Sequence, residues 1–349
     1  MKSQNTYYDV IPTGLRNSSR EYNKNYAYNP YENIDYSLSN VCYMNSSIQC
    51  LFHLREFADF IINDKHYGNK PLLTATRNLL IDMISYSNKN KKDLSVEEIK
   101  NEMSIIDDRY KYNNQEDANE FIANFLDALR EETSDKYNIG KNLVTFNDEL
   151  MKKAYEKFYN KFYVKKGNSS LLDLLYGTYI TETFCKKCRS LLTVKFSAFN
   201  MIELPIYHLA KQNEYNTLNI NKILDSYFSE SKIYGATCCG EKEVYSKISI
   251  FELPQNLIVF FGRTANGQYI NDRIDYSNTL NLNEYLHEKS NKNYLSYHLS
   301  GKIHYFSFKK KTGHYTASCI YKGEWFYFDD KMVLKQENKQ NEIILFYES

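Results

Sequence analysis

The chain has 349 residues, which is enough to bury a substantial core in one elaborate domain or in two small ones. Its 44 basic and 43 acidic side chains nearly cancel, so we expect neither a nucleic-acid partner nor a membrane-surface partner. The seven cysteines are few and odd in number, and no apolar run is long enough to span a bilayer. We therefore expect a protein inside the cell, in the cytoplasm, the nucleus or both.

Residues 1–35 are rich in Asn, Tyr and Ser and have no sustained periodicity. We expect this extension to be loosely ordered or draped on the fold. Ordered structure is expected to begin near Ser37.

Helical spacing dominates from about residue 36 to about residue 170. Apolar side chains recur over residues 48–62 and 72–84, and a clear stripe runs through NNQEDANEFIANFLDALREE at 113–132. For this last helix, Asn114 is the expected N-cap, and acidic residues occupy the first turn.

Strand-like runs dominate residues 171–349. These runs are LLTVKFSAF, KISIFEL, NLIVFF, KIHYFSF, YTASCIY, EWFYF and EIILFY. Lys-rich segments around 86–102 and 284–294 are expected to be solvated connections. A helical lobe followed by a β lobe predicts an α+β fold with a cleft between the lobes.

Cys42 stands just ahead of the first helical segment, in SLSNVCYMNSSIQCLFHL. A thiol in the first turn of a helix faces unpaired N–H groups and the positive end of the helix dipole, which favour the thiolate. Ser39 and Asn40 are the expected caps. Taken alone, Cys42 also fits a small buried residue, which is our expectation for Cys50.

The segment TGHYTASCIYKGEWFYFDD supplies a base and an orienting acid. His314 begins one predicted strand, residues 322–324 form a hairpin loop, and Asp329 ends the next strand. Pairing Tyr321 with Trp325 sets Asp329 on the wrong face, so a one-residue shift or a bulge has to correct the register. Taken alone, His314 is equally consistent with a surface histidine at a strand end, and Asp329 with a carboxylate in a turn. Together with the thiol of Cys42, they form the set of groups that acyl transfer to sulfur requires.

Several segments together resemble the ubiquitin-specific proteases, papain-like cysteine peptidases that remove ubiquitin from substrates. NVCYMNSSIQCL resembles the cysteine box, NNQEDANEFIANFLDALREE the glutamine-aspartate box, and GHYTASCIYKGEWFYFDDKMV the histidine box. CKKC, IELPI, ELPQNLIVFFGR and IILFYES also match in order. The resemblance implies one catalytic domain over 36–349, with a helical thumb lobe and a β palm and finger lobe. It also implies Cys42 as the nucleophile, His314 as the general base and Asp329 as the carboxylate that orients the imidazole.

The resemblance further implies a monomer that binds ubiquitin and ubiquitinated proteins and needs no cofactor for catalysis. Asp117 and Glu120 match acidic positions that engage the arginines of the ubiquitin tail. Gly313 and Tyr315 flank the base where the family narrows the channel around the last two glycines. Without the resemblance, the two acids fit a charge pair at a helix N-terminus, and Tyr315 fits an ordinary strand aromatic.

The residue expected to donate a hydrogen bond to the oxyanion differs from the family pattern. The family has an Asn five residues before the cysteine, and this chain has Ser37 there. Loss of one oxyanion donor costs about 100- to 1000-fold in turnover. The backbone N–H of Cys42 remains a donor, and Asn40 is an alternative if the loop bends differently. Ser39 and Thr312 also replace family glycines, so we expect loops of different shape.

The expected structural zinc site departs as well. Cys185 and Cys188 are separated by two residues, the spacing of one ligand pair in a structural zinc site. Ala236, however, stands where a third ligand is expected. Cys239 keeps the fourth position, and Cys238 is a replacement for the third, although adjacent cysteines bind one tetrahedral ion awkwardly. A structural zinc ion and a metal-free cluster both stay open.

Two other functions stay open beside the deubiquitinase. One is an attenuated or inactive relative that holds ubiquitin as a binding module, which Ser37 favours and the complete Cys42, His314 and Asp329 set opposes. The other is a transglutaminase-like acyltransferase, which shares the order of cysteine, histidine and aspartate along the chain.

Overall fold

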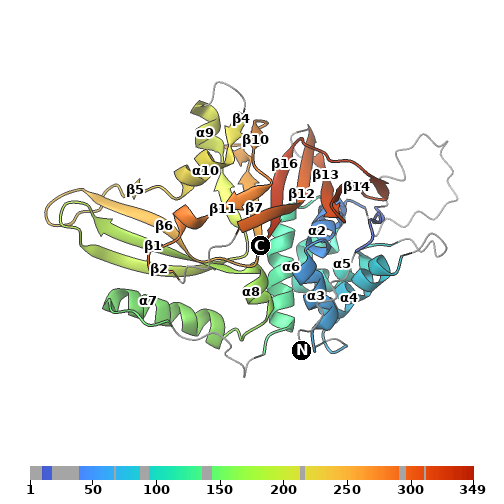
Figure 1. Ribbon diagram of the computed structural model, residues 1–349, viewed down its shortest axis with the longest axis horizontal. Coiled ribbons are helices and arrows are strands. Elements are labelled where there is room, and N and C mark those ends of the chain that lie inside the picture. The colour runs from blue at the N-terminus through green and yellow to red at the C-terminus, as the bar shows by residue number, and fades with distance from the viewer. Residues whose placement is uncertain are drawn as a thin grey trace. The chain divides into compact units, whose positions relative to one another are not determined.

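The computed structural model describes residues 10–17, 39–66, 68–86, 94–135, 144–212, 217–290, 296–309 and 312–349. The chain divides into two compact units, one of Met1–Thr133 with Ser300–Tyr347 and one of Ser134–Leu299 with the last two residues. The architecture mixes helices and strands, as the α+β prediction requires (Figure 1). We expected the helical lobe to end and the β lobe to begin near residue 170, and this division of the chain differs. The strands after Leu299 belong to the same unit as the N-terminal helices.

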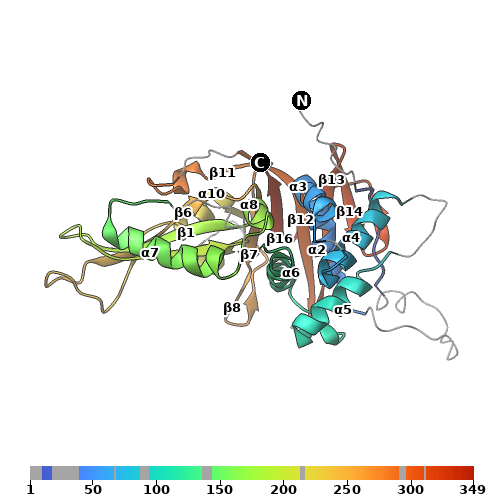
Figure 2. The same cartoon turned by 90° about the horizontal axis from the view of Figure 1, so that it is seen from below.

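Helices form most of the N-terminal part of the first unit. They are α2 (Cys42–Phe52), α3 (Arg55–Asn63), α4 (Pro71–Ile84), α5 (Glu97–Ile106), the 3-10 turn η2 (Asp108–Lys111) and α6 (Ala118–Glu132). The expectation of a solvated connection around 86–102 is wrong from Glu97 on, because Ile99 and Met103 give α5 a buried face that packs on α4 (Figure 2).

The strands of the first unit are β12 (Ser296–Lys309), whose first residues belong to the second unit, β13 (Thr312–Tyr321), β14 (Glu324–Asp329), β15 (Met332–Leu334) and β16 (Glu342–Glu348). They are ordered β15-β14-β13-β12-β16. Helix α2 contacts β13, β14 and α6 (Figure 1). Every residue of α2 is buried, which makes it the central helix of this unit.

The hairpin between β13 and β14 has the corrected register. Tyr321 pairs with Glu324, so the turn contains only Lys322 and Gly323, both at positive φ. Such two-residue turns match the twist of the flanking strands. The expected one-residue shift is confirmed, and Asp329 falls on the same face of the hairpin as His314.

Part of the N-terminal extension packs closely against the first unit. Val10 and Leu15 are buried, and the side-chain amide of Gln49 donates to the carbonyl of Thr13 at 2.6 Å. Of the two expectations for the extension, residues 10–17 follow the second, draped on the fold, because their backbone groups satisfy buried polar side chains of α2. The other positions of the extension lie outside the described residues.

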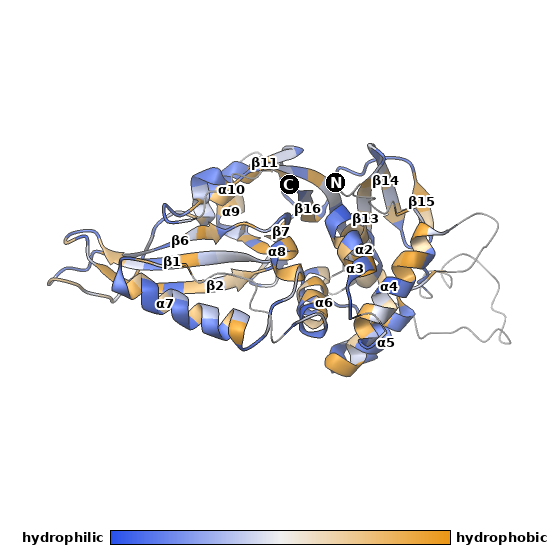
Figure 3. Cartoon of the chain, turned by 60° about the horizontal axis from the view of Figure 1, so that its bottom comes forward, coloured by the Kyte–Doolittle hydropathy of each residue, from blue (hydrophilic) through white to orange (hydrophobic). Residues whose placement is uncertain are grey.

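The second unit is built on a four-stranded antiparallel sheet of order β2-β1-β6-β5. Its helix α7 runs alongside β2 and carries both hydrophilic and hydrophobic residues (Figure 3). The buried ones are Met151, Tyr155 and Phe158. The elements of this unit are α7 (Glu149–Tyr159), η3 (Asn160–Val164), α8 (Leu171–Leu175), β1 (Gly177–Cys185), β2 (Leu191–Phe199), β3 (Ile202–Pro205), α9 (Tyr207–Gln212), β4 (Thr217–Asn219), α10 (Ile220–Tyr227), β5 (Ser231–Lys232), β6 (Val244–Glu252), β7 (Asn256–Gly262), β8 (Thr264–Ala265), β9 (Gln268–Tyr269), β10 (Arg273–Asp275), β11 (Thr279–Asn281) and η4 (Asn283–Tyr285).

Candidate active site

Cys42 is the first residue of α2 and is 3% exposed. At this position its backbone N–H has no partner within the helix, and the helix dipole favours an anion. The expected caps are wrong: Val41 is the N-cap and makes no side-chain bond, and the side-chain amide of Asn40 donates to the Asn113 carbonyl at 2.8 Å. Cys50 is a small buried residue, as expected.

His314 on β13 and Asp329 on β14 form a hydrogen-bonded pair. Nε2 of the imidazole lies 2.7 Å from Oδ1 of Asp329, and both side chains are largely buried. Cys42 also acts on the imidazole, and since Nε2 is engaged by Asp329, Nδ1 is the ring nitrogen left for its thiol. The hairpin register and the start of α2 thus bring imidazole, carboxylate and thiol together.

The pKa of His314 reports on this cluster. Burial disfavours the imidazolium, but hydrogen bonds with Asp329 and Cys42 and the nearby negative charges outweigh burial and raise the pKa of His314 to about 9. A protonated imidazole beside the thiol stabilises a thiolate, so the arrangement can generate a sulfur nucleophile and return a proton to a leaving group.

A second carboxylate lies behind this pair. Asp330 is 7% exposed, and its Oδ2 is 4.0 Å from Nε2 of His314. Its carboxylate accepts hydrogen bonds from Asn17 at 3.1 Å and from Asn45 at 2.9 Å. Sequence reasoning missed these three residues. The Asp-Asp pair was an available signal for Asp330, whereas Asn17 lies in a polar stretch without periodicity.

The segment that leads into α6 is tied to β13 by side chains two residues apart. The Gln115 amide donates to the Gly313 carbonyl at 2.9 Å and accepts from the Gly313 N–H at 3.1 Å. The hydroxyl of Tyr315 donates to Asp117 at 3.1 Å. A Cβ added at Gly313 would lie 2.3 Å from the ring of Tyr305, so a side chain there would require that ring to move.

Of the expected substrate-contact residues, Gly313 and Tyr315 flank His314 and Asp117 bonds to Tyr315, with two differences from the sequence interpretation. Asp117 is the N-cap of α6 and already accepts a bond from the chain, and the expected N-cap Asn114 is wrong because it precedes the helix by several residues. Glu120 pairs with Arg109, and both of these side chains are about half exposed. A guanidinium group therefore already contacts one of the two acids.

Ser37, the expected replacement for the oxyanion Asn, lies outside the described residues. The N–H of Cys42 stays a candidate donor, because a helix leaves its first N–H groups without intrahelical partners. Asn40 has φ 59, and its amide is directed to the Asn113 carbonyl.

Four cysteines gather in the second unit. Their sulfur atoms all lie within 4.8 Å of one another, with Cys185 and Cys239 at 3.8 Å and Cys188 and Cys238 at 3.7 Å. In a tetrahedral zinc site with Zn–S bonds near 2.3 Å, neighbouring sulfurs are about 3.8 Å apart. The donor set and its spacing fit a tetrahedral zinc ion.

A tight turn explains how adjacent cysteines reach one point. Cys238 and Glu241 exchange backbone hydrogen bonds at 2.9 Å, and the two residues between them have positive φ, 46 for Cys239 and 80 for Gly240. The awkwardness expected for neighbouring ligands is relieved by this left-handed backbone, which glycine adopts without strain.

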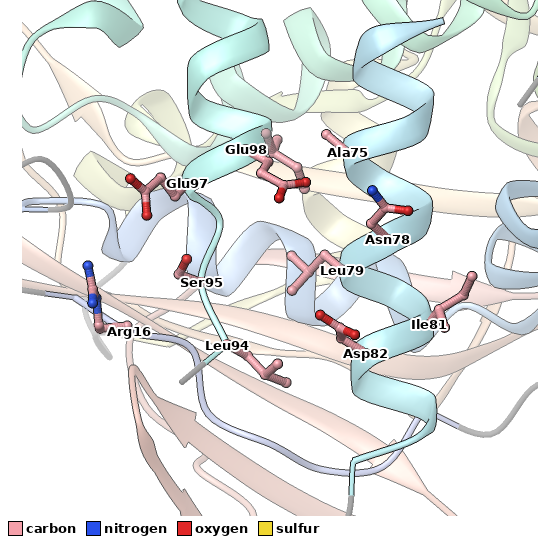
Figure 4. A pocket seen from close by; sticks show the side chains of 11 residues that line it. Arg16, Ala75, Asn78, Leu79, Ile81, Asp82, Leu94, Ser95, Glu97 and Glu98 are labelled. Atoms are coloured by element: carbon pink, nitrogen blue, oxygen red, sulfur yellow. The ribbon is translucent and has the colours of Figure 1, made fainter. Parts of the chain in front are cut away.

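A separate cavity of about 470 Å³ lies in the first unit between α4 and the start of α5 (Figure 4). Arg16, Asp82, Glu97 and Glu98 are among its lining residues. The described residues that line it include none of the catalytic candidates, so this cavity is distinct from the cluster around His314.

Comparisons with known proteins agree with this fold. A family model described as ubiquitin carboxyl-terminal hydrolase matches residues 36–347. The chain therefore belongs to the ubiquitin carboxyl-terminal hydrolase family. Among the helices in the described part of the chain, none has the length and apolar character that crossing a bilayer demands.

Two curated relatives cover most of this chain. Ubiquitin carboxyl-terminal hydrolase 2 of Homo sapiens is 28% identical over an alignment of 336 positions that covers 89% of this chain and 54% of the human protein. Ubiquitin carboxyl-terminal hydrolase Usp2 of Drosophila melanogaster is 23% identical over an alignment of 335 positions that covers 89% of this chain and 34% of the fly protein. The chain spans about half or less of the length of these relatives.

Solved structures share the fold. A chain of the SAGA Ubp8/Sgf11/Sus1/Sgf73 DUB module bound to ubiquitin aldehyde superposes with a TM-score of 0.70 at 17% identity, covering 98% of this chain and 70% of that chain. The same TM-score and identity hold for that module bound to monoubiquitin. At this identity the likeness defines the fold alone.

Proposed function

We propose that this protein is a deubiquitinase that hydrolyses the isopeptide or peptide bond at the C-terminal glycine of ubiquitin. The observation that carries the proposal is the hydrogen-bonded pair of His314 and Asp329 beside the thiol of Cys42. Family membership and the ubiquitin-bound solved neighbours support ubiquitin and ubiquitinated proteins as partners. A monomer stays a prediction, because those neighbours are chains of a multi-protein module.

In this proposal, His314 takes the proton of Cys42, and the thiolate attacks the carbonyl carbon of the last glycine. The resulting oxyanion accepts a hydrogen bond from the N–H of Cys42. His314 then protonates the departing lysine amine, and the thioester forms as the C–N bond breaks. Water, deprotonated by His314, hydrolyses the thioester and restores the thiol. Asp329 holds the imidazole and stabilises its charged form throughout.

The acidic start of α6 would receive the basic ubiquitin tail. Glu120 is already paired with Arg109, but an exposed pair of this kind contributes only about 0.2–1 kcal/mol, so an incoming arginine can exchange with it. Gly313, where a side chain would collide with the Tyr305 ring in its present position, would line the narrow channel for the two terminal glycines.

Turnover of ubiquitin with a fluorogenic C-terminal amide tests this function. We expect turnover by wild type and by Cys50→Ala, which removes a buried thiol of the same helix, and at least about a thousandfold less by Cys42→Ala. Full activity of Cys42→Ala would contradict the proposal. Binding of ubiquitin without turnover by wild type would indicate a binding module, and amine incorporation without hydrolysis would indicate an acyltransferase.

We also propose that Cys185, Cys188, Cys238 and Cys239 hold a structural zinc ion in the second unit. The support is the fit of four sulfurs to one tetrahedral ion. The ion would link the end of β1 to the turn before β6, and no step of the hydrolysis is assigned to it.

A further inference from the structure

Two buried thiols of the first unit lie side by side. Cys50 on α2 and Cys319 on β13 are 1% and 0% exposed, and their sulfur atoms are 3.8 Å apart. Helix α2 packs on β13 (Figure 1), and Gly301 of β12 pairs with Cys319. A Cβ added to Gly301 would lie 3.4 Å from the sulfur of Cys50. The two thiols are therefore enclosed between α2 and two strands of the sheet.

This pair belongs neither to the proposed zinc site nor to the cluster around His314. Those two are the sets of described residues whose ligand atoms are spaced to hold a metal ion. The sulfur of Cys50 has the Lys302 carbonyl oxygen as a further neighbour, at 3.4 Å. Two thiols in contact, without a third ligand at metal-site spacing, favour a covalent bond between them over a bound ion.

A histidine beside the pair favours the reactive form of one thiol. His53, the C-cap of α2, is 8% exposed and donates from Nδ1 to the Gln49 carbonyl at 2.7 Å. Burial disfavours a thiolate at Cys319, but a hydrogen bond with Cys50 and the charge and hydrogen bond of His53 outweigh burial, so the pKa of Cys319 is lowered. The pKa of Cys50 is raised, chiefly by burial. Cys319 is thus the sulfur that reacts first with an oxidant.

We propose that Cys50 and Cys319 are a redox modification site, at which hydrogen peroxide forms a disulfide that links α2 to β13. The Cys319 thiolate attacks one oxygen of the peroxide, the O–O bond breaks, and the leaving hydroxide takes up the proton that Cys319 released. Cys50 then attacks the sulfur of this sulfenic acid, so the S–S bond forms as the S–O bond breaks. The second hydroxide leaves with the proton of Cys50, and the two electrons lost by the thiols have reduced the peroxide to two waters.

The packing already has the two sulfurs close to bonding position. Their separation must fall from 3.8 Å to about 2.05 Å, which rotation of the two side chains about their Cα–Cβ bonds can supply. The bond would join the helix that begins at Cys42 to the strand that carries His314. Because it links residues 269 positions apart, it would restrict the unfolded chain and stabilise the first unit.

The experiment oxidises the full chain with hydrogen peroxide and maps its thiols. Cys42→Ala is the parent protein, because it removes the other thiol of α2. Remaining thiols are alkylated as the protein is unfolded, and the tryptic peptides are read by mass spectrometry with and without dithiothreitol. We expect a peptide pair joined through Cys50 and Cys319 that dithiothreitol separates, and none when Cys50→Ala is added to the parent. No readout uses ubiquitin, so the inference is independent of the proposed function.

The rate of disulfide formation in urea separates reaction of the folded protein from reaction of unfolded chains. Below the unfolding transition we expect the rate to change less than about twofold, because the folded protein itself is oxidised. A rate that rises in proportion to the unfolded fraction would overturn the inference. Recovery of both Cys50 and Cys319 as alkylated free thiols after peroxide would overturn it as well.

Thermal unfolding measures the cross-link itself. Peroxide should raise the Tm of the Cys42→Ala parent by about 5 °C relative to the treated variant that also carries Cys50→Ala. Dithiothreitol should remove this rise, and because it does not reverse methionine oxidation, the reversal isolates the disulfide. A joined peptide pair with an unchanged or lower Tm would show that the native packing does not accommodate the bond, contrary to the inference.

Discussion

At the scale of single residues, the protonation of His314 links the proposed catalytic cluster to the stability of the first unit. Its pKa is about 9 in the folded protein, against an ordinary value of 6.5. A raised folded-state pKa contributes stability in full below pH 6.5, and this contribution is lost as the pH rises through about 9. The charged form is the stable one because the hydrogen bonds with Asp329 and Cys42 outweigh burial.

Asp329→Asn tests this linkage, since it removes the carboxylate that accepts the 2.7 Å bond of the ring. Without that acceptor charge, burial dominates and the pKa of His314 falls. We expect the wild type to have the higher Tm, with the largest difference below pH 6.5 and a smaller one near pH 9. Thermal unfolding from pH 5.5 to 9.5 measures the difference.

Asp108→Asn is the control, because Asp108 is an exposed carboxylate of η2 in the same unit. We expect its Tm to differ from that of wild type by an amount that does not follow the titration of His314. A gap between wild type and Asp329→Asn that widens toward pH 9 would contradict the assigned direction.

Sequence patterns pointed to the proposed reacting groups more readily than to the residues that contact them. Cys42, His314 and Asp329 each belong to a recognisable local pattern, a helix start or a strand end, so their chemistry and spacing gave a testable hypothesis. Asn17 and Asp330 meet across 313 positions of the chain. No periodicity encodes such a contact, because both partners are polar residues outside regular elements or at their ends.

At the scale of elements, the β13–β14 hairpin decides which face Asp329 occupies. Its two-residue turn needs positive φ at both positions, 50 at Lys322 and 80 at Gly323. A slip of one residue would turn Asp329 away from His314, since side chains alternate faces along a strand. The turn is therefore a determinant of the geometry of the proposed catalytic pair, although it lies at the far end of the hairpin.

Paired substitutions in this turn have opposite expected effects. Gly323→Ala introduces a Cβ at positive φ and should cost about 1–2 kcal/mol of unfolding free energy, together with a loss of turnover. Lys322→Asn builds the Asn-Gly pair that this turn type favours, so it should raise the Tm and keep turnover. Urea unfolding and the fluorogenic assay measure both, and a neutral Gly323→Ala would show that the turn does not determine the register.

Element prediction succeeded where one face is buried and was wrong where polar residues surround a short apolar pattern. The stripe at 113–132 became α6, and runs such as LLTVKFSAF became strands, because burial imposes a strict period. Helix α5 was missed since its Lys- and Glu-rich sequence suggested solvent. The apolar run at 48–62 divides into α2 and α3 at His53–Leu54, a break that helical spacing alone does not locate.

At the scale of the whole molecule, the proposed zinc site belongs to the second unit and the proposed catalytic cluster to the first. We expect one zinc ion per chain in the purified wild type and in Cys50→Ala, and little zinc in Cys239→Ser, by elemental analysis. Because a structural metal contributes its binding energy to folding, chelation should also lower the Tm. Wild type that contains no zinc and has a Tm unaffected by chelators would favour the metal-free cluster.

The first unit is discontinuous in the chain, and this has a consequence for synthesis on the ribosome. About 166 residues, Ser134–Leu299, are translated between its helical part and its strands, which takes roughly ten to thirty seconds at ordinary elongation rates. Nascent chains of the intervening unit can begin to fold during that interval, because that unit is almost continuous. The proposed nucleophile Cys42 is therefore made well before the proposed base His314 and its acid Asp329, so we expect no hydrolysis by a nascent chain until synthesis has passed Asp329.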